Sequence, residues 1–227
     1  MLIGGLQKMT MLDYPGKVAC TIFTYGCNFR CPFCHNATLV IDEASLIPKE
    51  EILSYINKRK GILDGVVVTG GEPLLQNDII DFLRELRESG LLIKLDTNGS
   101  YPEKLKEIID LGLVDYVAMD IKNSRDKYEL TTGTKIDIKK IEKSVEILME
   151  NRVDYEFRTT VVKEYHEMED FYQIGEWLKG AKRLFLQPFK DSENLIGENL
   201  QSHTPQALEG FKRVLETNIN EVSIRGI

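Results

Sequence analysis

The sequence lacks the long hydrophobic runs and the excess of basic residues that would indicate a membrane or a nucleic-acid partner. Its apolar stretches, such as Gly65–Thr69, are far shorter than the roughly 20 residues of a membrane helix, and Met1–Thr10 lacks the charged-then-apolar layout of a signal peptide. Lysine and arginine number 29 against 36 aspartates and glutamates, so the net charge of −7 would repel a phosphate backbone. We therefore expect a cytoplasmic protein that binds neither a membrane nor nucleic acid.

Cysteine is scarce as well, and it is unevenly placed. Three of the four cysteines, Cys27, Cys31 and Cys34, fall within eight residues, and only Cys20 lies outside this group. Four cysteines would permit two disulfides, but three in one short segment are better suited to binding a single metal centre. Three reduced core cysteines are the simpler alternative, which is disfavoured because buried structural cysteines seldom bunch so tightly.

The rest of the composition is that of a soluble globular protein, with 42% hydrophobic and 29% charged residues in 227. Short apolar segments alternate with segments that have helical spacing. The predicted strands are Lys17–Thr24, Val66–Val68, Leu91–Leu95, Tyr116–Ile121, Tyr155–Val162 and Arg183–Leu186. The predicted helices are Pro48–Lys60, Asp78–Ser89, Pro102–Leu111, Ile138–Glu150, Met168–Lys179 and Pro205–Glu216.

Repeated alternation of this kind indicates an α/β fold in which right-handed helical crossovers join parallel strands. A complete barrel of eight such units uses about 250 residues, so the shorter pattern predicts a partial (β/α)6 TIM-like barrel that is open on one side. No linker-like segment divides the chain, and we expect residues 1–227 to form one domain. In such folds the reactive residues lie at the carboxyl ends of the strands.

Polar and glycine-rich segments do follow the predicted strands. The first strand is followed by the three cysteines, the next three by Gly70–Pro73, Asp96–Gly99 and Asp120–Lys122, and the fifth contains Arg158. The two glycine-containing segments also have a simpler interpretation as ordinary turns, and Asp120–Lys122 as a solvated ion pair on one side of a strand. Because all of them belong to strand ends, we expect them to converge on one face of the molecule.

The three thiolates suit iron–sulfur or zinc chemistry, because both take soft sulfur ligands. A structural zinc ion needs four protein ligands, and the further candidates are His35, next to Cys34, and Cys20, which the strand pattern buries. A set of three ligands indicates instead a centre with an open coordination position that binds a substrate or a cofactor. A zinc-stapled interaction module is the alternative from another functional class.

The spacing Cys27-x3-Cys31-x2-Cys34 resembles the signature of the radical S-adenosylmethionine (radical SAM) enzymes, and the later segments match that superfamily in order over essentially the whole chain. The resemblance implies that the three cysteines bind one 4Fe–4S cluster, whose fourth iron binds S-adenosylmethionine, and that reduction yields a 5′-deoxyadenosyl radical. It also implies that Phe33 lies against the adenine ring, and it places Lys122 with the three cysteines among the catalytic residues.

The same resemblance gives cofactor-binding roles to the strand-end segments. In the Gly70-Gly71-Glu72 motif backbone groups meet the methionine amino group, and glycine permits this close approach because it has no Cβ. The expected cofactor-binding residues are Phe33, Gly70, Gly71, Glu72, Asp96, Asn98, Asp120, Lys122 and Arg158. Asp96, Thr97 and Asp120 are also the expected ligands of a monovalent cation, which some members of the superfamily hold.

Three further segments resemble the activating enzymes of glycyl radical enzymes, namely Cys34–Asn36, Asp13–Gly16 and Tyr128–Gly133. They are similar to the activators of pyruvate formate-lyase and of anaerobic ribonucleoside-triphosphate reductase, and Asp13–Gly16 favours the reductase. The resemblance implies that the radical removes hydrogen from a backbone glycine of a partner enzyme, with an electron donor of the flavodoxin or ferredoxin type. Some activators carry additional ferredoxin-like cysteines, but only Cys20 lies outside the motif here, so we expect one cluster.

An alternative is a radical enzyme that acts on a small molecule in deazaguanine synthesis, although Asp-Thr usually follows the third cysteine there, in place of the His-Asn of this chain. Pyruvate formate-lyase activating enzyme has a histidine after its sixth strand, where this chain has Leu186–Phe189, so that contact is absent or replaced. His166 is expected at a solvated helix start, and neither His166 nor His203 is assigned a role.

Overall fold

The computed structural model describes residues 1–41, 45–192 and 194–226, which contain one eight-stranded sheet with the strands in chain order. The strands are β1 (Ile3–Thr10), β2 (Ala19–Thr24), β3 (Gly65–Gly70), β4 (Leu92–Thr97), β5 (Tyr116–Asp120), β6 (Asp154–Val161), β7 (Arg183–Pro188) and β8 (Glu221–Ile224). β1 pairs with β2 in the antiparallel sense, and every later neighbour pairs in parallel. Within the described residues β1 and β8 are the two edges and do not pair, so the barrel is open.

The six predicted strands are β2 to β7, which confirms the open α/β architecture, but the sheet contains two strands that the sequence pattern did not predict. β1 was missed because two glycines and a polar Gln-Lys pair interrupt its apolar alternation. β8 was missed because it is only four residues long and carries polar residues at two of its positions. Both are edge strands, where one-sided pairing places a weaker demand on the sequence pattern.

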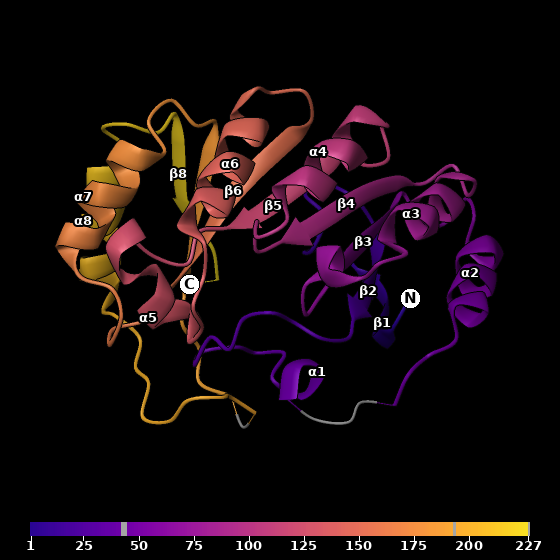
Figure 1. The fold of residues 1–227 in the computed structure, drawn as a ribbon, viewed down its shortest axis with the longest axis horizontal. Helices are drawn as coiled ribbons and strands as arrows, with labels where there is room; N and C mark the ends of the chain where they lie inside the picture. The colour runs from indigo at the N-terminus through magenta and orange to yellow at the C-terminus, as the bar shows by residue number, and fades with distance from the viewer. Residues whose placement is uncertain (42–44, 193, 227) are drawn as a thin grey trace.

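The helices are α1 (Thr38–Ile41), α2 (Lys49–Lys58), α3 (Ile79–Arg87), α4 (Pro102–Asp110), α5 (Tyr128–Thr132), α6 (Ile138–Met149), α7 (Met168–Trp177) and α8 (Pro205–Leu215). The longer helices lie on the outer side of the curved sheet, from α2 near the first strands to α7 and α8 beside β8, whereas the short helices α1 and α5 lie below the sheet in the view of Figure 1. Two short 3₁₀ turns, Pro73–Leu75 and Arg125–Lys127, complete the described elements. In this part of the chain, no helix has the length and apolar character needed to cross a membrane.

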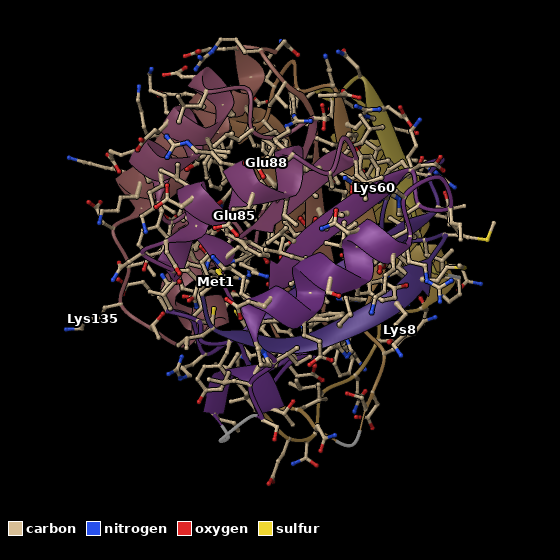
Figure 2. The ribbon with its side chains drawn as sticks, turned by 90° about the vertical axis from the view of Figure 1, so that its right-hand side faces the viewer. Met1, Lys8, Lys60, Glu85, Glu88 and Lys135 are labelled. Atoms are coloured by element: carbon tan, nitrogen blue, oxygen red, sulfur yellow. The ribbon has the colours of Figure 1, made fainter. Side chains whose placement is uncertain are left out.

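The outer helices turn charged faces to solvent. In the view of Figure 2, Glu85 and Glu88 of the α3 region lie at the surface beside α2. Glu85 accepts a hydrogen bond from Lys49 at 2.7 Å, which links α3 to α2. Both side chains are about one-third exposed, so solvent screens this ion pair, and burial of apolar surface holds the helices to the sheet.

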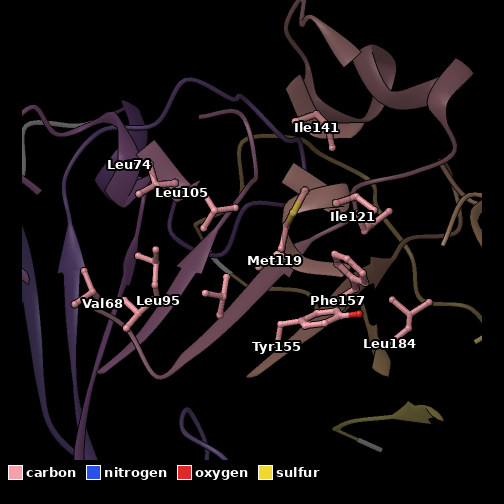
Figure 3. Close-up of a cluster of buried hydrophobic side chains, with 14 of the residues drawn as sticks. Val68, Leu74, Leu95, Leu105, Met119, Ile121, Ile141, Tyr155, Phe157 and Leu184 are labelled. Atoms are coloured by element: carbon pink, nitrogen blue, oxygen red, sulfur yellow. The ribbon is translucent and has the colours of Figure 1, made fainter. Parts of the chain in front are cut away.

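The two faces of the sheet differ in chemistry because side chains alternate along each strand. One set of alternating residues points outward and packs under the helices, including Val68, Leu95, Met119 and Phe157 in the cluster of Figure 3. This layer is the main hydrophobic core. The other set points into the barrel, where charged residues such as Lys94, Asp96 and Glu156 lie beside a smaller apolar cluster that includes Val67 and Tyr116.

An ion pair between a buried glutamate and a partly exposed arginine holds the end of β8. Glu156 of β6 is fully buried, and both of its carboxylate oxygens bind the guanidinium of Arg225, at 2.7 and 2.8 Å. Tyr116 of β5 donates a third hydrogen bond to the same carboxylate, at 2.8 Å. A bidentate Arg–carboxylate pair satisfies the buried charge, so the last strand closes onto the polar interior of the sheet.

Candidate functional site

The strand-end segments meet around a cavity of about 260 Å³ at the carboxyl ends of the parallel strands. Its lining includes every predicted site residue except Glu72: Cys27, Cys31, Phe33, Cys34, Gly70, Gly71, Asp96, Thr97, Asn98, Asp120, Lys122 and Arg158. Segments from five strands therefore converge on one face, as the positions of the motifs predicted. The individual binding roles of these residues stay predictions.

The cysteine loop follows β2, and two hydrogen bonds from Arg30 hold it in place. Arg30 donates from its guanidinium to the carbonyl oxygen of Cys27 at 2.7 Å, and the amide of Arg30 donates to the carbonyl of Thr132 at 2.8 Å. Cys31 is buried, whereas Cys27 and Cys34 are partly exposed toward the cavity. The loop thus presents three thiols to one cavity and is fastened to α5 from outside.

Burial controls the protonation of two of these thiols. It raises the pKa of Cys27 to about 12, and it raises the pKa of Cys31 to about 11 even though the nearby positive charge of Lys122 opposes the rise. At neutral pH both sulfurs therefore carry protons, and a bound metal centre must displace them to obtain thiolate ligands.

A chain of ion pairs crosses the cavity floor from β4 to the end of β5. Asp96 binds Lys94 and lies 3.0 Å from a terminal nitrogen of Arg158. The Nε of Arg158 donates to Asp120 at 2.9 Å, and the Nζ of Lys122 lies 2.9 Å from the other oxygen of Asp120. The alternative of an ion pair between Asp120 and Lys122 is right about the contact but not about its solvation, because the pair is partly buried and belongs to a network of five charged side chains.

The charges in this network hold one another in the ionised state. Burial by itself would raise the pKa of Asp120, but Arg158 and Lys122 outweigh it and lower the value to about 2. Burial likewise opposes ionisation of Asp96, whose pKa is lowered by Arg158 and Lys94. Burial disfavours the charged form of Lys122, yet Asp120 raises its pKa well above the usual range. Asp96, Asp120 and Lys122 are therefore charged at neutral pH.

The pKa of Asp120 predicts a loss of stability in acid. Its carboxyl titrates at about 2 when folded, against a reference value of 3.8, so its contribution of about 2 kcal/mol is present above pH 4 and disappears as the pH falls through 2. Asp120→Asn should lower the urea midpoint at pH 7, and its midpoint should approach the wild-type value at pH 2. Asp81→Asn, which changes an exposed acid in α3, is the control, and its urea midpoint should change with pH as the wild-type midpoint does. If the midpoint of Asp120→Asn differed from the wild-type midpoint by the same amount at pH 7 and at pH 2, the prediction would be contradicted.

The carboxylate of Glu72 points away from the cavity and into the protein. It is fully buried and accepts hydrogen bonds from the Thr97 hydroxyl at 2.8 Å, the Asn98 amide at 2.7 Å and the Leu74 amide at 3.0 Å. Burial raises its pKa to about 7 against the effect of these hydrogen bonds. Of the Gly-Gly-Glu motif, only the two glycines line the cavity, and Glu72 joins the turn after β3 to the turn after β4.

The two glycines are required by close backbone packing. Gly70 has a φ of +116°, and the amide of Gly71 donates to the Thr24 carbonyl at 2.9 Å. A Cβ at position 71 would lie 2.0 Å from the carbonyl oxygen of Gly26, the residue before Cys27. The turn after β3 therefore lies directly against the start of the cysteine loop, which no larger residue would allow.

Several cavity residues were not among the predicted ligands. Thr69, Thr160 and Gln187 line the cavity from β3, β6 and β7, together with His35 and Asn36 of the cysteine loop. Their position in the sequence could have identified them. Thr160 follows Arg158 by two residues, so the alternation of side chains along a strand places both on the same face. Gln187 occupies the region after the sixth predicted strand where the histidine of the activating enzyme is missing.

His166 lies at a helix start as expected, because the next residue, Glu167, caps α7, but the expectation that His166 is solvated was wrong. The residue is fully buried, and its Nε2 lies 2.9 Å from the carbonyl oxygen of Lys122. The acidic residues around it in the sequence do face solvent in part, but the imidazole turns inward and stacks on Phe171 with ring centroids 5.9 Å apart. Phe33 is also buried, with its ring 6.1 Å from that of Tyr165, while it lines the cavity.

Comparison with known proteins agrees with this geometry. The profile of the Radical SAM superfamily matches residues 21–178. A protein of Methanocaldococcus jannaschii, named as a candidate glycyl-radical enzyme activating enzyme, is 35% identical over 100% of this chain and 96% of its own length. The pyruvate formate-lyase-activating enzyme of Clostridium pasteurianum is 34% identical over 58% of this chain and 57% of its own. The chain is a radical SAM protein of the glycyl-radical enzyme activating family.

The fold is also shared with solved structures of low sequence identity. The crystal structure of Streptococcus suis SuiB bound to the precursor peptide SuiA superimposes with a TM-score of 0.70, at 14% identity, over 89% of this chain and 48% of that chain. An identity this low supports only the common architecture of the sheet and its helices.

A radical SAM site requires a 4Fe–4S cluster and S-adenosylmethionine, and the residues present fit both. Three thiols from one loop face a common cavity, which suits a cluster with one iron open to a ligand. Among the residues that the structure describes, no group of three His, Cys, Asp or Glu side chains, the three cysteines included, is already drawn together around one metal position. Cys20 is buried in the main core outside the cavity lining and is not a fourth ligand.

The monovalent cation stays a prediction. Its expected carboxylate ligands, Asp96 and Asp120, are bound by side-chain cations, and the hydroxyl of Thr97 donates to Glu72. A cation at this place would therefore compete with Arg158 for the same oxygens.

Proposed function

We propose that this activating enzyme removes a hydrogen atom from a backbone glycine of a partner protein, and that the partner is an anaerobic ribonucleoside-triphosphate reductase. The observation that carries the proposal is the mixed chemistry of the cavity lining. Asp96, Asp120, Lys122 and Arg158 pair with one another, whereas Thr69, Thr160 and Gln187 add neutral polar groups to the same lining. Uncharged amide and hydroxyl groups suit a peptide backbone better than a phosphorylated or carboxylated small molecule.

The charged residues of the cavity lining would bind the cofactor. Lys122 and Arg158 would face its carboxylate, Asp96 and Asp120 would hold these cations in place, and the turn at Gly70 and Gly71 would admit its amino group close to the backbone. When bound, the cluster and S-adenosylmethionine supply the electron and the 5′-deoxyadenosyl group that accepts the hydrogen atom.

The choice of partner rests on the Asp13–Gly16 segment, which resembles the reductase activators. In the structure Tyr14 is buried with its ring 6.0 Å from that of Tyr116, and Asp13 accepts a hydrogen bond from Thr21 at 2.7 Å. This segment therefore closes the end of the barrel opposite the cysteine loop. Pyruvate formate-lyase is the second candidate partner, since the relative from Clostridium pasteurianum carries that name. A flavodoxin or ferredoxin would supply the electron in either case.

Isotope transfer tests this proposal directly. The reconstituted, reduced enzyme is mixed with S-adenosylmethionine and either the reductase or pyruvate formate-lyase, each labelled with glycine that carries deuterium at Cα. We expect deuterium in 5′-deoxyadenosine and a glycyl radical signal in the electron paramagnetic resonance spectrum with the reductase. A reductase variant with alanine at the radical glycine is the control. Transfer only from pyruvate formate-lyase would reassign the partner, and turnover of a carboxylated pterin without transfer from either protein would overturn the proposal.

A further inference from the structure

The backbone of Lys122 is held by two side chains after the strand ladder has ended. β5 ends at Asp120, and the amide of Ile121 still donates to the Arg158 carbonyl of β6 at 2.8 Å. At Lys122 the amide donates instead to the phenol oxygen of Tyr128, at 3.3 Å. The Lys122 carbonyl lies 2.9 Å from Nε2 of His166. Both main-chain polar groups of one residue are thus satisfied by buried side chains from other elements.

The two side chains are themselves rigidly placed. Tyr128 and His166 are both buried, and the ring of Tyr128 packs edge-on against Trp177 with centroids 6.1 Å apart. The Lys122 carbonyl oxygen can only accept, so Nε2 of His166 carries the ring proton and donates to it. Nδ1 lies 3.2 Å from both the amide nitrogen and the carbonyl oxygen of Val162. Burial lowers the pKa of His166, which keeps this neutral form at neutral pH.

The helix that carries Tyr128 also contacts the cysteine loop. The Thr132 carbonyl accepts the amide hydrogen bond of Arg30, and Gly133, with a φ of +66°, ends α5 where a Cβ would lie 2.5 Å from the Arg30 carbonyl oxygen. One short helix therefore touches both the loop between Cys27 and Cys31 and the turn that carries Lys122. Its position sets the separation of these two parts of the site.

We propose that Tyr128 and His166 are positioning residues that clamp the Lys122 backbone and thereby aim its ammonium group at the bound S-adenosylmethionine. The inference rests on the proposed role of Lys122 in cofactor binding. Neither residue lines the cavity, so each acts through Lys122 and not on the cofactor itself. Loss of either contact would free the turn, and the Lys122 side chain would spend less time in the binding geometry.

Tyr128→Phe removes only the hydroxyl, and Tyr155→Phe is its matched control. Tyr155 is as deeply buried, and its phenol oxygen accepts a hydrogen bond from the Lys182 amide at 3.3 Å, away from the cavity. His166→Leu removes the imidazole donor, and His166→Gln restores a donor near Nε2. Two quantities are measured: amide hydrogen exchange at Lys122 in the protein without cofactor, and the Kd for S-adenosylmethionine in the reconstituted protein.

We expect Tyr128→Phe and His166→Leu each to speed exchange at Lys122 and to raise the Kd about tenfold, and His166→Gln to recover most of both. Tyr155→Phe should change neither. Unchanged exchange and Kd in Tyr128→Phe, or an equal change in Tyr155→Phe, would overturn the clamp. If the wild-type protein takes up iron but binds no S-adenosylmethionine, the proposed function and the proposed role of the clamp both fail. If only the clamp is wrong, the wild-type protein still binds S-adenosylmethionine.

Discussion

Cys31→Ala is expected to lose the iron–sulfur cluster and to reduce the formation of 5′-deoxyadenosine at least about a thousandfold, because two thiolates cannot hold the cluster with one iron open to the cofactor. The measurement is iron content after anaerobic reconstitution, followed by the electron paramagnetic resonance spectrum of the reduced protein with and without S-adenosylmethionine. The wild-type spectrum should change when the cofactor is added. Cys27→Ala and Cys34→Ala should behave as Cys31→Ala does.

Cys20→Ala provides the matched control. Cys20 is a fully buried free cysteine of β2 that packs in the main hydrophobic core. Its replacement creates a small cavity and should cost about 1 kcal/mol of stability, with full iron uptake and an unchanged spectrum. Full iron uptake by Cys31→Ala would contradict the assignment of the ligands, and tightly bound zinc in the wild-type protein would favour a structural metal instead.

Gly71→Ala is expected to destabilise the protein by about 4 kcal/mol and to lower its melting temperature by about 10 °C. The new Cβ would lie 2.0 Å from the Gly26 carbonyl oxygen and 2.6 Å from its carbon, both of them backbone atoms that cannot move independently. The start of the cysteine loop must shift to relieve this contact. Iron uptake should therefore fall together with stability, which links the turn after β3 to the cluster.

Gly5→Ala is the control for this prediction. At Gly5 of β1 an added Cβ would meet Phe23 at 3.5 Å, which is an ordinary van der Waals distance. Its melting temperature should stay within a few degrees of the wild-type value. If Gly71→Ala unfolds at the same temperature as Gly5→Ala and binds iron normally, the close approach is not required for the fold or for the loop.

The six central strands and their helices could be predicted because each carries its own local pattern. Buried strands such as β3 have short apolar runs, and helices such as α3 have an apolar stripe, and both patterns reflect burial on a fixed period. The charged interior of the barrel was harder to see. Lys94 and Glu156 interrupt apolar strands, and only the alternation of the strands shows that both face inward, where Glu156 meets Arg225 from the far edge of the sheet.

Some features of the candidate site could likewise be predicted from the sequence, and others could not. The contact between Asp120 and Lys122 could be foreseen as an alternative from their spacing of two residues, although Lys122 lies in the turn after β5. The bridge from Arg158 to both Asp96 and Asp120 could not be foreseen, because it depends on the parallel register that aligns Asp120 with Arg158. The burial of His166 was also unpredictable, since its neighbours in the sequence are acidic and its contacts come from distant elements.

The sequence by itself determined the three-cysteine spacing and the strand-end motifs, and hence the radical SAM family. Each of these motifs consists of a few consecutive residues, and their order is the order of the chain. Only the tertiary structure decided which groups face the cavity and which support it. Glu72 belongs to the Gly-Gly-Glu motif, yet it turns inward to bind the turn after β4, and Tyr128 and His166 reach the backbone of Lys122 from two other elements. These assignments depend on packing between segments far apart in the chain, and no local pattern records such contacts.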